Sequence, residues 1–234
     1  MNTMYLCAGD KGGTGKSMVA ATLIDAFLQR GIEPLLVETD TANPDVFKSY
    51  GERIQCAALS LDEADGWIQL INTVDQARGV PVIVNTAARS GSGVARYGAT
   101  LKSTLGELDR KLVTLWIINR QRDSLELLAD YLDAMPVGAD HQAHVLRNLY
   151  FGAAEKFQLF NGSDIKKRIE ESGGKTLDFP DLADRVADQL ATDRLTIQGA
   201  LEAMPLGHKA ELIRCPSWAS ASTMWRTVLC ARMS

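Results

Sequence analysis

A glycine-rich segment with two lysines and a terminal hydroxyl group lies near the start of the chain. Residues 9–17 read Gly-Asp-Lys-Gly-Gly-Thr-Gly-Lys-Ser. Glycines let the backbone wrap tightly so that successive N–H groups face phosphate oxygens, and a helix beginning near Ser17 adds the positive end of its dipole. Lys16 would then reach the β- and γ-phosphates, and the Ser17 hydroxyl would be a ligand of Mg²⁺. The segment therefore predicts a phosphate-binding loop.

The segments on either side of this loop support the prediction. An apolar strand over Thr3–Ala8 precedes it, and a helix with an apolar face follows it, as a P-loop requires. Asp10 stands where the usual pattern Gly-x4-Gly-Lys-Ser has its first glycine, and a second lysine, Lys11, precedes the double glycine. The alternative is a Gly-rich strand-to-helix turn without a ligand, which the lysine, the hydroxyl and the flanks disfavour.

Short apolar runs alternate with amphipathic stretches along most of the chain, a pattern typical of βαβ units around a parallel sheet. The runs are almost continuously apolar, which fits a sheet covered by helices on both faces. We therefore expect an α/β fold with a mostly parallel twisted sheet. The predicted strands are Thr3–Ala8, Pro34–Glu38, Val82–Asn85, Leu112–Ile118 and Val145–Asn148, with weaker candidates at Gln55–Ala58 and Lys175–Asp178.

Start signals mark several of the helices between these strands. Ser60 with Glu63 has the spacing of a capping box, and Asp123 with Glu126 has the same spacing. Ser163 is placed to cap a helix that ends before Gly173. The apolar stripe of the first of these helices is predicted to comprise Ala64, Trp67, Ile68, Ile71 and Val74.

The last part of the chain reads as helical. Trp218, Trp225, Val228 and Leu229 could share one face of a short helix. Docking of this face on the chain's own domain is favoured over a membrane-surface helix, because the polar face is only weakly basic. We expect a nucleotide-binding domain over residues 1–205 and a helical tail over residues 206–234 packed on it.

Composition limits the classes of function. The 234 residues are 46% apolar and 23% charged, with a net charge of −4, so we expect a sizeable core and no general coating of nucleic acid. The basic groups Arg110-Lys111 and 166–168 are read as solvated faces. Four scattered cysteines indicate neither a zinc site nor a disulfide framework. With no apolar run long enough to cross a bilayer and no signal-peptide core, a cytoplasmic location is expected and membrane binding is not.

The stretch from Lys11 to Ser17 resembles the deviant Walker A signature of the ParA/MinD family of P-loop ATPases. The resemblance implies ATP or ADP with Mg²⁺ as ligands, and a homodimer that closes around ATP. In that family the early lysine reaches the partner's phosphates, a role that falls on Lys11; a cation from the other subunit neutralises charge as an arginine finger does. The residues implied to hold the nucleotide phosphates are Gly12, Gly13, Thr14, Gly15, Lys16, Ser17 and Met18.

Two further segments resemble the acidic motifs of the family. Asp40 falls on the acid of the switch I segment, where a carboxylate could orient the attacking water or hold a magnesium-bound water; the alternative is a cap for a helix near residues 45–50. Asn85 occupies the place of the Walker B aspartate. An amide can still hold a magnesium-bound water but carries no charge, so we expect weak hydrolysis and expect Asn85→Asp to raise turnover.

Candidate contacts to the base follow two later strands. Asn148 and the loop at Phe179–Asp181, with Pro180 at its centre, resemble the base-side positions of the family. An asparagine offers a donor and an acceptor to a purine edge, and the guanine signature Asn-Lys-x-Asp does not occur, so ATP is favoured over GTP. Asn119, which follows another predicted strand, is the rival to Asn148.

Within the family, the sequence is most similar to plasmid conjugal-transfer, mobilisation and stability ATPases of the TraL, MobD and StbB types. This likeness implies a nucleotide-dependent dimer switch that acts with other plasmid transfer or stability proteins. The alternative is a partition or positioning protein that binds DNA or membrane in its ATP state. A metabolic ligase or a redox ATPase ranks last, because neither Cys7 nor Cys56 is placed to hold a cluster and no second-substrate pocket is readable.

Overall fold

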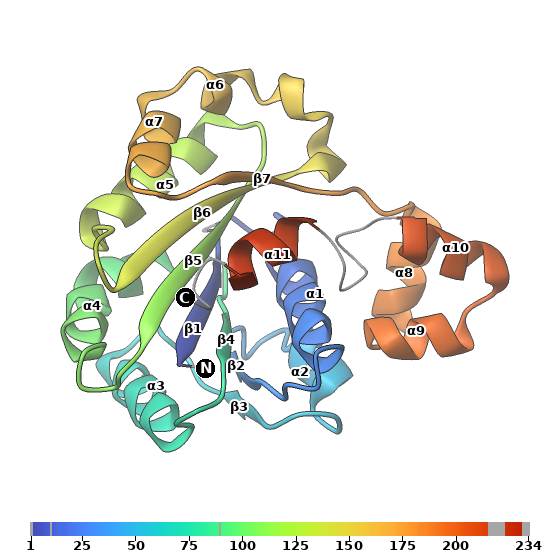
Figure 1. Cartoon of the computed structure of the whole chain (residues 1–234), viewed down its shortest axis with the longest axis horizontal. Helices are drawn as coiled ribbons and strands as arrows, with labels where there is room; N and C mark the ends of the chain where they lie inside the picture. Colours follow the sequence, from blue (N-terminus) through green and yellow to red (C-terminus); the bar gives the residue numbers. More distant parts are fainter. Residues whose placement is uncertain (1, 10, 89, 215–222, 231–234) are drawn as a thin grey trace.

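The computed structural model describes residues 2–9, 11–88, 90–214 and 223–230. Its centre is a parallel sheet of seven strands in the order β3-β2-β4-β1-β5-β6-β7 (Figure 1). The predicted α/β fold is confirmed, and each predicted strand, including the two weaker ones, is present with shifts of a few residues at its ends. The strands are β1 Thr3–Ala8, β2 Leu35–Glu38, β3 Cys56–Ala58, β4 Val82–Asn85, β5 Lys111–Ile118, β6 His141–Asn148 and β7 Thr176–Phe179.

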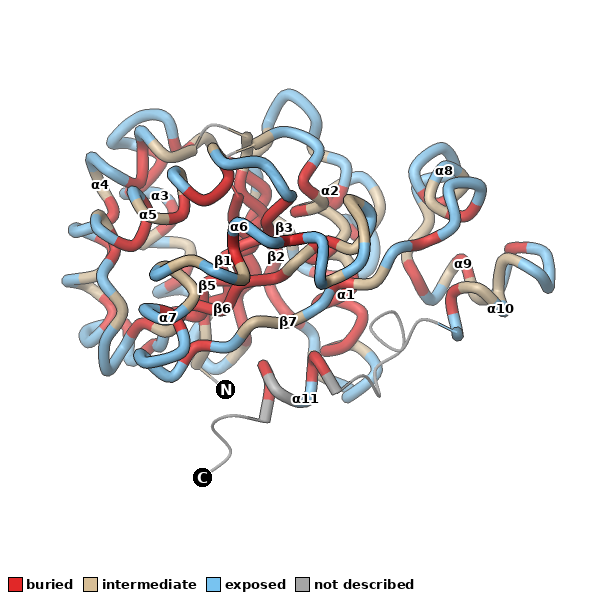
Figure 2. The backbone as a smooth tube through the Cα atoms, turned by 90° about the horizontal axis from the view of Figure 1, so that it is seen from above, coloured by how far each residue is buried: buried red, intermediate tan, exposed pale blue. Residues whose placement is uncertain are grey.

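Helices cover both faces of this sheet (Figures 1 and 2). One face packs on α1 (Lys16–Leu28), α2 (Asp45–Tyr50), α8 (Asp184–Thr192), α9 (Ile197–Ala203) and α11 (Thr223–Cys230). The other packs on α3 (Ala64–Gln76), α4 (Gly91–Thr104), α5 (Arg122–Ala134), α6 (Gln158–Asn161) and α7 (Asp164–Glu171). Alternate residues of β1 enter the two cores, Tyr5 and Cys7 on one side and Leu6 on the other. Period-two alternation therefore gives the molecule its three layers.

Two helix starts differ from the sequence prediction. Helix α3 begins at Ala64 with Glu63 as an N-cap that makes no side-chain cap, and the Ser60 hydroxyl accepts instead from the Asp62 amide at 3.2 Å. Its buried face also differs from the predicted stripe: Leu70 is fully buried, whereas Ile68, predicted to be in the stripe, is 57% exposed.

Helix α5 likewise begins at Arg122, so Asp123 lies in its first turn and not at its cap. The predicted Ser163 cap is present, with the Ser163 hydroxyl accepting from the Lys166 amide at 3.2 Å at the start of α7.

The end of the described chain returns to the sheet. Helices α8 and α9 and helix α10 (Leu206–Arg214) form a group at one side of the molecule, and α11 lies beside α1 (Figure 1). Trp225, Val228 and Leu229 of α11 are buried in the same core as Tyr5 and Val113 of the sheet. Trp218, predicted to share their face, lies outside the described residues. None of the helices within the described ranges is long and apolar enough to cross a membrane.

Candidate nucleotide-binding site

The glycine-rich loop lies at the carboxyl ends of the strands, between β1 and α1. Gly13 and Gly15 have φ values of 73° and 101°, which L side chains rarely adopt. A Cβ at Gly15 would also lie 2.6 Å from the Asn148 Nδ2 atom, and one at Gly9 would lie 2.8 Å from the Ile117 carbonyl oxygen. Glycine is therefore required both for the backbone conformation and for the close approach of β5 and β6.

The first turn of α1 is free of acidic side chains, and its N-cap residue, Gly15, has no side chain that could cap the first amides. The first amide groups of an α-helix have no partner within the helix, and they carry the positive end of its dipole. A phosphate group at this position would accept from several of these amides at once. The backbone at the start of α1 is therefore suited to an anion.

Lys16 lies inside the loop, with 7% of its surface exposed. Its Nζ donates to the Lys11 carbonyl oxygen at 2.8 Å, so the ammonium group is held over the centre of the loop. A hollow of about 270 Å³ opens beside it, and its wall includes Asp40 together with the loop. The predicted phosphate-binding residues that line this hollow are Gly12, Gly13, Thr14, Gly15, Lys16, Ser17 and Met18.

Lys11 is directed away from this hollow, toward α5 of the same chain. Its Nζ forms an ion pair with Asp123 and lies 3.5 Å from the Gln121 Oε1 atom. Both side chains of the ion pair are partly exposed, at 33% for Lys11 and 45% for Asp123. Such a pair is weak enough to exchange for another anion. The ion pair was missed from the sequence, because Asp123 was read there as a helix cap.

A carboxylate and an amide face each other next to Ser17. Glu38 ends β2 and Asn85 ends β4, and the strand register places them directly opposite. The Asn85 Nδ2 atom donates to both Glu38 carboxylate oxygens, at 3.0 and 3.1 Å, and lies 3.3 Å from the Ser17 Oγ atom. Burial raises the pKa of Glu38, and hydrogen bonds from Asn85 and from the Asp40 amide oppose that rise. The structure thus brings the predicted Walker B residue to the predicted magnesium ligand.

Asp40 lies at the mouth of the hollow. Its backbone amide donates to Glu38 Oε1 at 3.1 Å, and its carboxylate accepts from the Asn43 amide at 3.0 Å. The N-cap of α2 is Pro44, which leaves Asp40 outside the helix start. The alternative of a helix cap is therefore wrong, and Asp40 lines the same hollow as the glycine loop.

A second hollow of about 210 Å³ adjoins the loop on the side of β6 and β7. Met18, Asn148 and Pro180 line it, as do Tyr150 and Phe179. Asn119 instead lines a separate small hollow beside α5. Of the two rival asparagines, only Asn148 lies where the loop and the predicted base-side segment meet.

Asn148 also holds the glycine loop in place. Its Nδ2 atom donates to the Thr14 carbonyl oxygen at 2.8 Å, and its Oδ1 atom accepts from the Tyr150 amide at 3.1 Å. Each polar atom of the side chain thus has a partner in the loop or the strand end. Sequence reasoning missed this contact, because the two residues are 134 positions apart.

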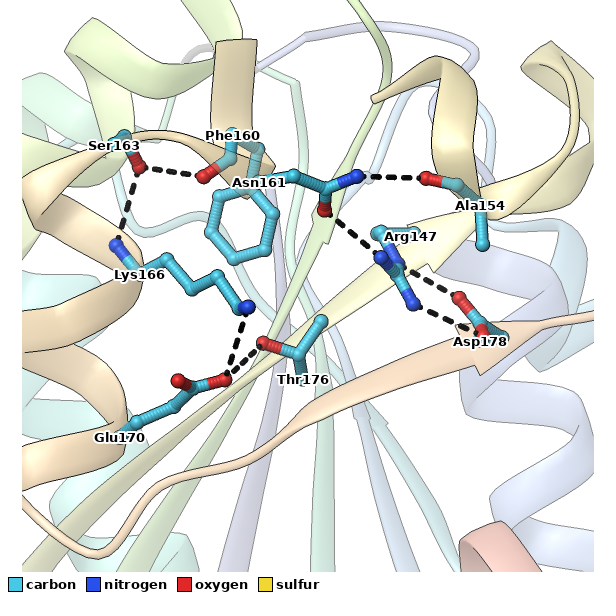
Figure 3. A network of polar contacts seen from close by, with 9 residues as sticks. All are labelled: Arg147, Ala154, Phe160, Asn161, Ser163, Lys166, Glu170, Thr176 and Asp178. Carbon is cyan, nitrogen blue, oxygen red and sulfur yellow. Dashed lines mark hydrogen bonds and ion pairs between the residues drawn. The ribbon is translucent and has the colours of Figure 1, made fainter. Parts of the chain in front are cut away.

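A polar network next to Asn148 fixes β7 (Figure 3). Arg147 donates to both Asp178 oxygens, at 2.7 and 3.1 Å, and also to Asn161 at 2.8 Å. These contacts join β6, β7 and the segment before α7. Since β7 leads directly into Pro180, the network positions the base-side wall of the second hollow.

Most of the basic residues noted in the sequence form contacts within the chain. Arg110 is buried, at 3% exposure, and donates to the carbonyl oxygens of Val74 in α3 and of Ala77 and Val80 after it, so its reading as part of a solvated face is wrong. In α7, Lys166 pairs with Glu170 and Lys167 with Asp164. Arg168 pairs with Asp133, so each basic residue of this helix has an acidic partner within the chain.

Comparisons with known proteins identify the family and the fold of the chain. Residues 5–147 match the model of the CobQ/CobB/MinD/ParA nucleotide binding domain. Over 212 residues the chain is 52% identical to the protein MobD of Acidithiobacillus ferrooxidans, which covers 91% of this chain and 92% of that protein.

Solved structures show the same fold at low sequence identity. The MinD cell division protein of Aquifex aeolicus superimposes with a TM-score of 0.56 at 12% identity, covering 100% of this chain and 99% of that one. A nucleotide-binding protein of Archaeoglobus fulgidus in complex with ADP has a TM-score of 0.50 at 12% identity, covering 86% and 91%.

Proposed function

The chain belongs to the CobQ/CobB/MinD/ParA family of nucleotide-binding domains and is of the plasmid-related, MobD-like ATPase type, and from this premise we propose that it is an ATP-dependent dimer switch in plasmid transfer, mobilisation or stable inheritance. The proposal is supported mainly by the different placement of the two lysines of the glycine loop. Lys16 lies inside the glycine loop, and Lys11 is held at its rim by a partly exposed ion pair. A single chain has use for the first lysine, whereas the second is directed away from the phosphate hollow, and its side chain is exposed enough (33%) to exchange its partner when another chain approaches.

Each residue has a defined task in this proposal. The amides of Gly12–Ser17 and the Lys16 ammonium group bind the phosphates, and Asn148 keeps the loop in shape. The Ser17 hydroxyl and the Asn85 side chain fit a Mg²⁺ ion with its water, because the buried Asn85 Oδ1 atom has no hydrogen-bond partner among the described residues. Magnesium, when bound, neutralises phosphate charge. Asp40 orients the attacking water.

Dimer formation requires Lys11 to exchange Asp123 for a phosphate of the partner's nucleotide. The ion pair with Asp123 competes with this exchange, so the free chain favours the monomer. Hydrolysis removes the phosphate that Lys11 binds and opens the dimer. We expect slow hydrolysis, because the neutral Asn85 stands in place of a Walker B carboxylate. The preference for ATP over GTP rests on the base-side hollow at Asn148 and Pro180.

The test is light scattering coupled to size-exclusion chromatography, with nucleotide content measured on each peak. With ATP and Mg²⁺, wild type is expected to bind nucleotide and dimerise. Lys11→Ala is expected to bind nucleotide and remain monomeric, and Lys16→Ala is expected to lose most of its bound nucleotide. A wild type that binds no nucleotide would refute the ATPase assignment, and one that binds it but remains monomeric would refute the dimer switch.

A further inference from the structure

The last residues of β2 and β4 place an acid and an amide at the edge of the sheet that carries Ser17. Glu38 and Asn85 are opposite each other in the strand register, with exposures of 0% and 1%. A Walker B strand ends in a carboxylate, and this one ends in an amide. The neighbouring strand has a buried carboxylate in contact with that amide.

The direction of the Asn85 amide follows from its neighbour. A carboxylate only accepts hydrogen bonds, so the Nδ2 atom must face Glu38, as its contacts at 3.0 and 3.1 Å show. The Oδ1 atom then points away from Glu38. It is buried and has no hydrogen-bond partner among the described residues. A buried acceptor left unpaired is costly unless a ligand or water pairs with it.

Glu38 has no cationic partner among the described residues. Its partners are the Asn85 amide, the Asp40 backbone N–H at 3.1 Å and the Thr39 backbone, and no lysine, arginine or histidine of the described chain forms an ion pair with it. A buried carboxylate without a cation is strongly disfavoured. A cation beside Ser17 would compensate this charge, because the Asn85 Nδ2 atom that contacts Glu38 lies 3.3 Å from the Ser17 Oγ atom.

We propose that the acid of the magnesium site has moved to the next strand: Glu38 supplies the negative charge, and Asn85 Oδ1 accepts from a magnesium-bound water. The inference rests on the proposed function and deepens it. Asn85 thereby links the acid of β2 to the metal that Ser17 holds. Glu38 acts through Asn85 and is a positioning residue.

This exchange changes what Asn85→Asp should do by itself. An aspartate would place two carboxylates at hydrogen-bond distance in a buried position, where both cannot be ionised at once. The single substitution is therefore expected to destabilise the nucleotide-free protein and to give no gain in turnover. We expect faster ATP hydrolysis only from the double variant Glu38→Gln with Asn85→Asp. This variant again has one carboxylate and one amide, with the carboxylate on β4.

The experiment compares ATP affinity in Mg²⁺ and in EDTA for wild type, E38Q, N85D and E38Q/N85D, by isothermal titration calorimetry. Thermal unfolding without nucleotide is measured on the same samples to compare their folding. Glu33→Gln is the control, because it removes one exposed carboxylate just before β2. The quantity compared is the ratio of the two affinities, which a loss of fold stability alone does not change.

Wild type and E33Q are expected to bind ATP more tightly with Mg²⁺. E38Q should lose this enhancement on the order of tenfold while its affinity in EDTA stays within about threefold. E38Q/N85D should recover both the enhancement and the melting temperature that N85D lacks. An E38Q variant with the wild-type enhancement, or a double variant that does not recover it, would overturn the charge exchange and leave the proposed function standing. A wild type that binds ATP in neither condition would overturn both.

Discussion

Glu38 and Asp178 are carboxylates at the same edge of the sheet, and each contacts the residue directly opposite on the adjacent strand. Asp178 faces the Arg147 guanidinium, which donates to both of its oxygens, and its side chain is 41% exposed (Figure 3). Glu38 faces the neutral Asn85 amide and is fully buried.

The difference distinguishes a charge that stabilises the fold from a charge that is placed to interact with a ligand. The pair on β6 and β7 is neutralised within the chain, and it joins two strands next to the base-side hollow. The pair on β2 and β4 carries uncompensated charge in the place where desolvation costs most. A buried charge that has no opposite charge in the chain is expected where a bound ligand neutralises it.

The largest effect is expected from Lys16→Ala, which removes the cation on the ligand-directed side of this comparison. The ammonium group would form charge-assisted hydrogen bonds with phosphate, so its loss should weaken ATP binding by about 100-fold or more. Calorimetric titration provides the measurement. Lys209→Ala on α10 is the control, and it should bind ATP as wild type does. An affinity for Lys16→Ala within about threefold of wild type would contradict the placement of the phosphates.

A third buried contact, between the neutral side chains of Thr114 and His141, can be compared with the two carboxylate pairs. The Thr114 hydroxyl lies 2.9 Å from the His141 Nε2 atom, and burial lowers the pKa of His141 to about 4. The unfolded chain takes up this proton near pH 6.5, so the stabilisation is complete above pH 6.5 and is lost as the pH falls toward 4. The contribution amounts to about 3 kcal/mol of unfolding free energy.

Urea unfolding between pH 7 and pH 4 measures this contribution when wild type is compared with His141→Gln. The comparison is needed because Asp25 acts in the opposite direction: burial raises its pKa to about 6, so its contribution grows as the pH falls from 6 toward 3.8. The difference between the two proteins isolates His141. Equal slopes in the two proteins would show that His141 does not remain neutral in the folded state.

The smallest effect is expected from Asp178→Ala on the neutralised side of the comparison. The ion pair is partly exposed, so its loss should cost about 1 kcal/mol or less in urea unfolding. ATP affinity with Mg²⁺ should remain within about threefold of wild type, because the carboxylate serves the strand pairing. A loss of magnesium dependence comparable to that of Glu38→Gln would remove the distinction between the two carboxylates.

The strands and the loop could be predicted because their signals are local. Apolar runs mark β1, β4 and β5, with β-branched residues prominent in the last two, and the glycines with Lys16 mark the phosphate loop within nine consecutive residues. Helix starts were harder to predict. The Asp123 carboxylate that suggested a cap is drawn to Lys11, and a tertiary ion pair thus overrides a local signal.

The contacts that complete the site could not be predicted from spacing. Glu38 meets Asn85 across 47 residues, Lys11 meets Asp123 across 112, and Asn148 meets Thr14 across 134. Each depends on the order and register of the strands, which place β4 between β1 and β2 and β6 beyond β5. Sequence reasoning found most of the participants, but the pairing between them is a property of the folded sheet.

The most direct test of the account is a crystal structure of the protein with Mg²⁺ and a non-hydrolysable ATP analogue. The account predicts the phosphates on the amides of Gly12–Ser17 with Lys16 beside them, the metal on the Ser17 hydroxyl, and the base in the hollow at Asn148 and Pro180. It also predicts a water between the metal and Asn85 Oδ1. A nucleotide bound elsewhere on the molecule, or a metal without contact to Ser17, would contradict it.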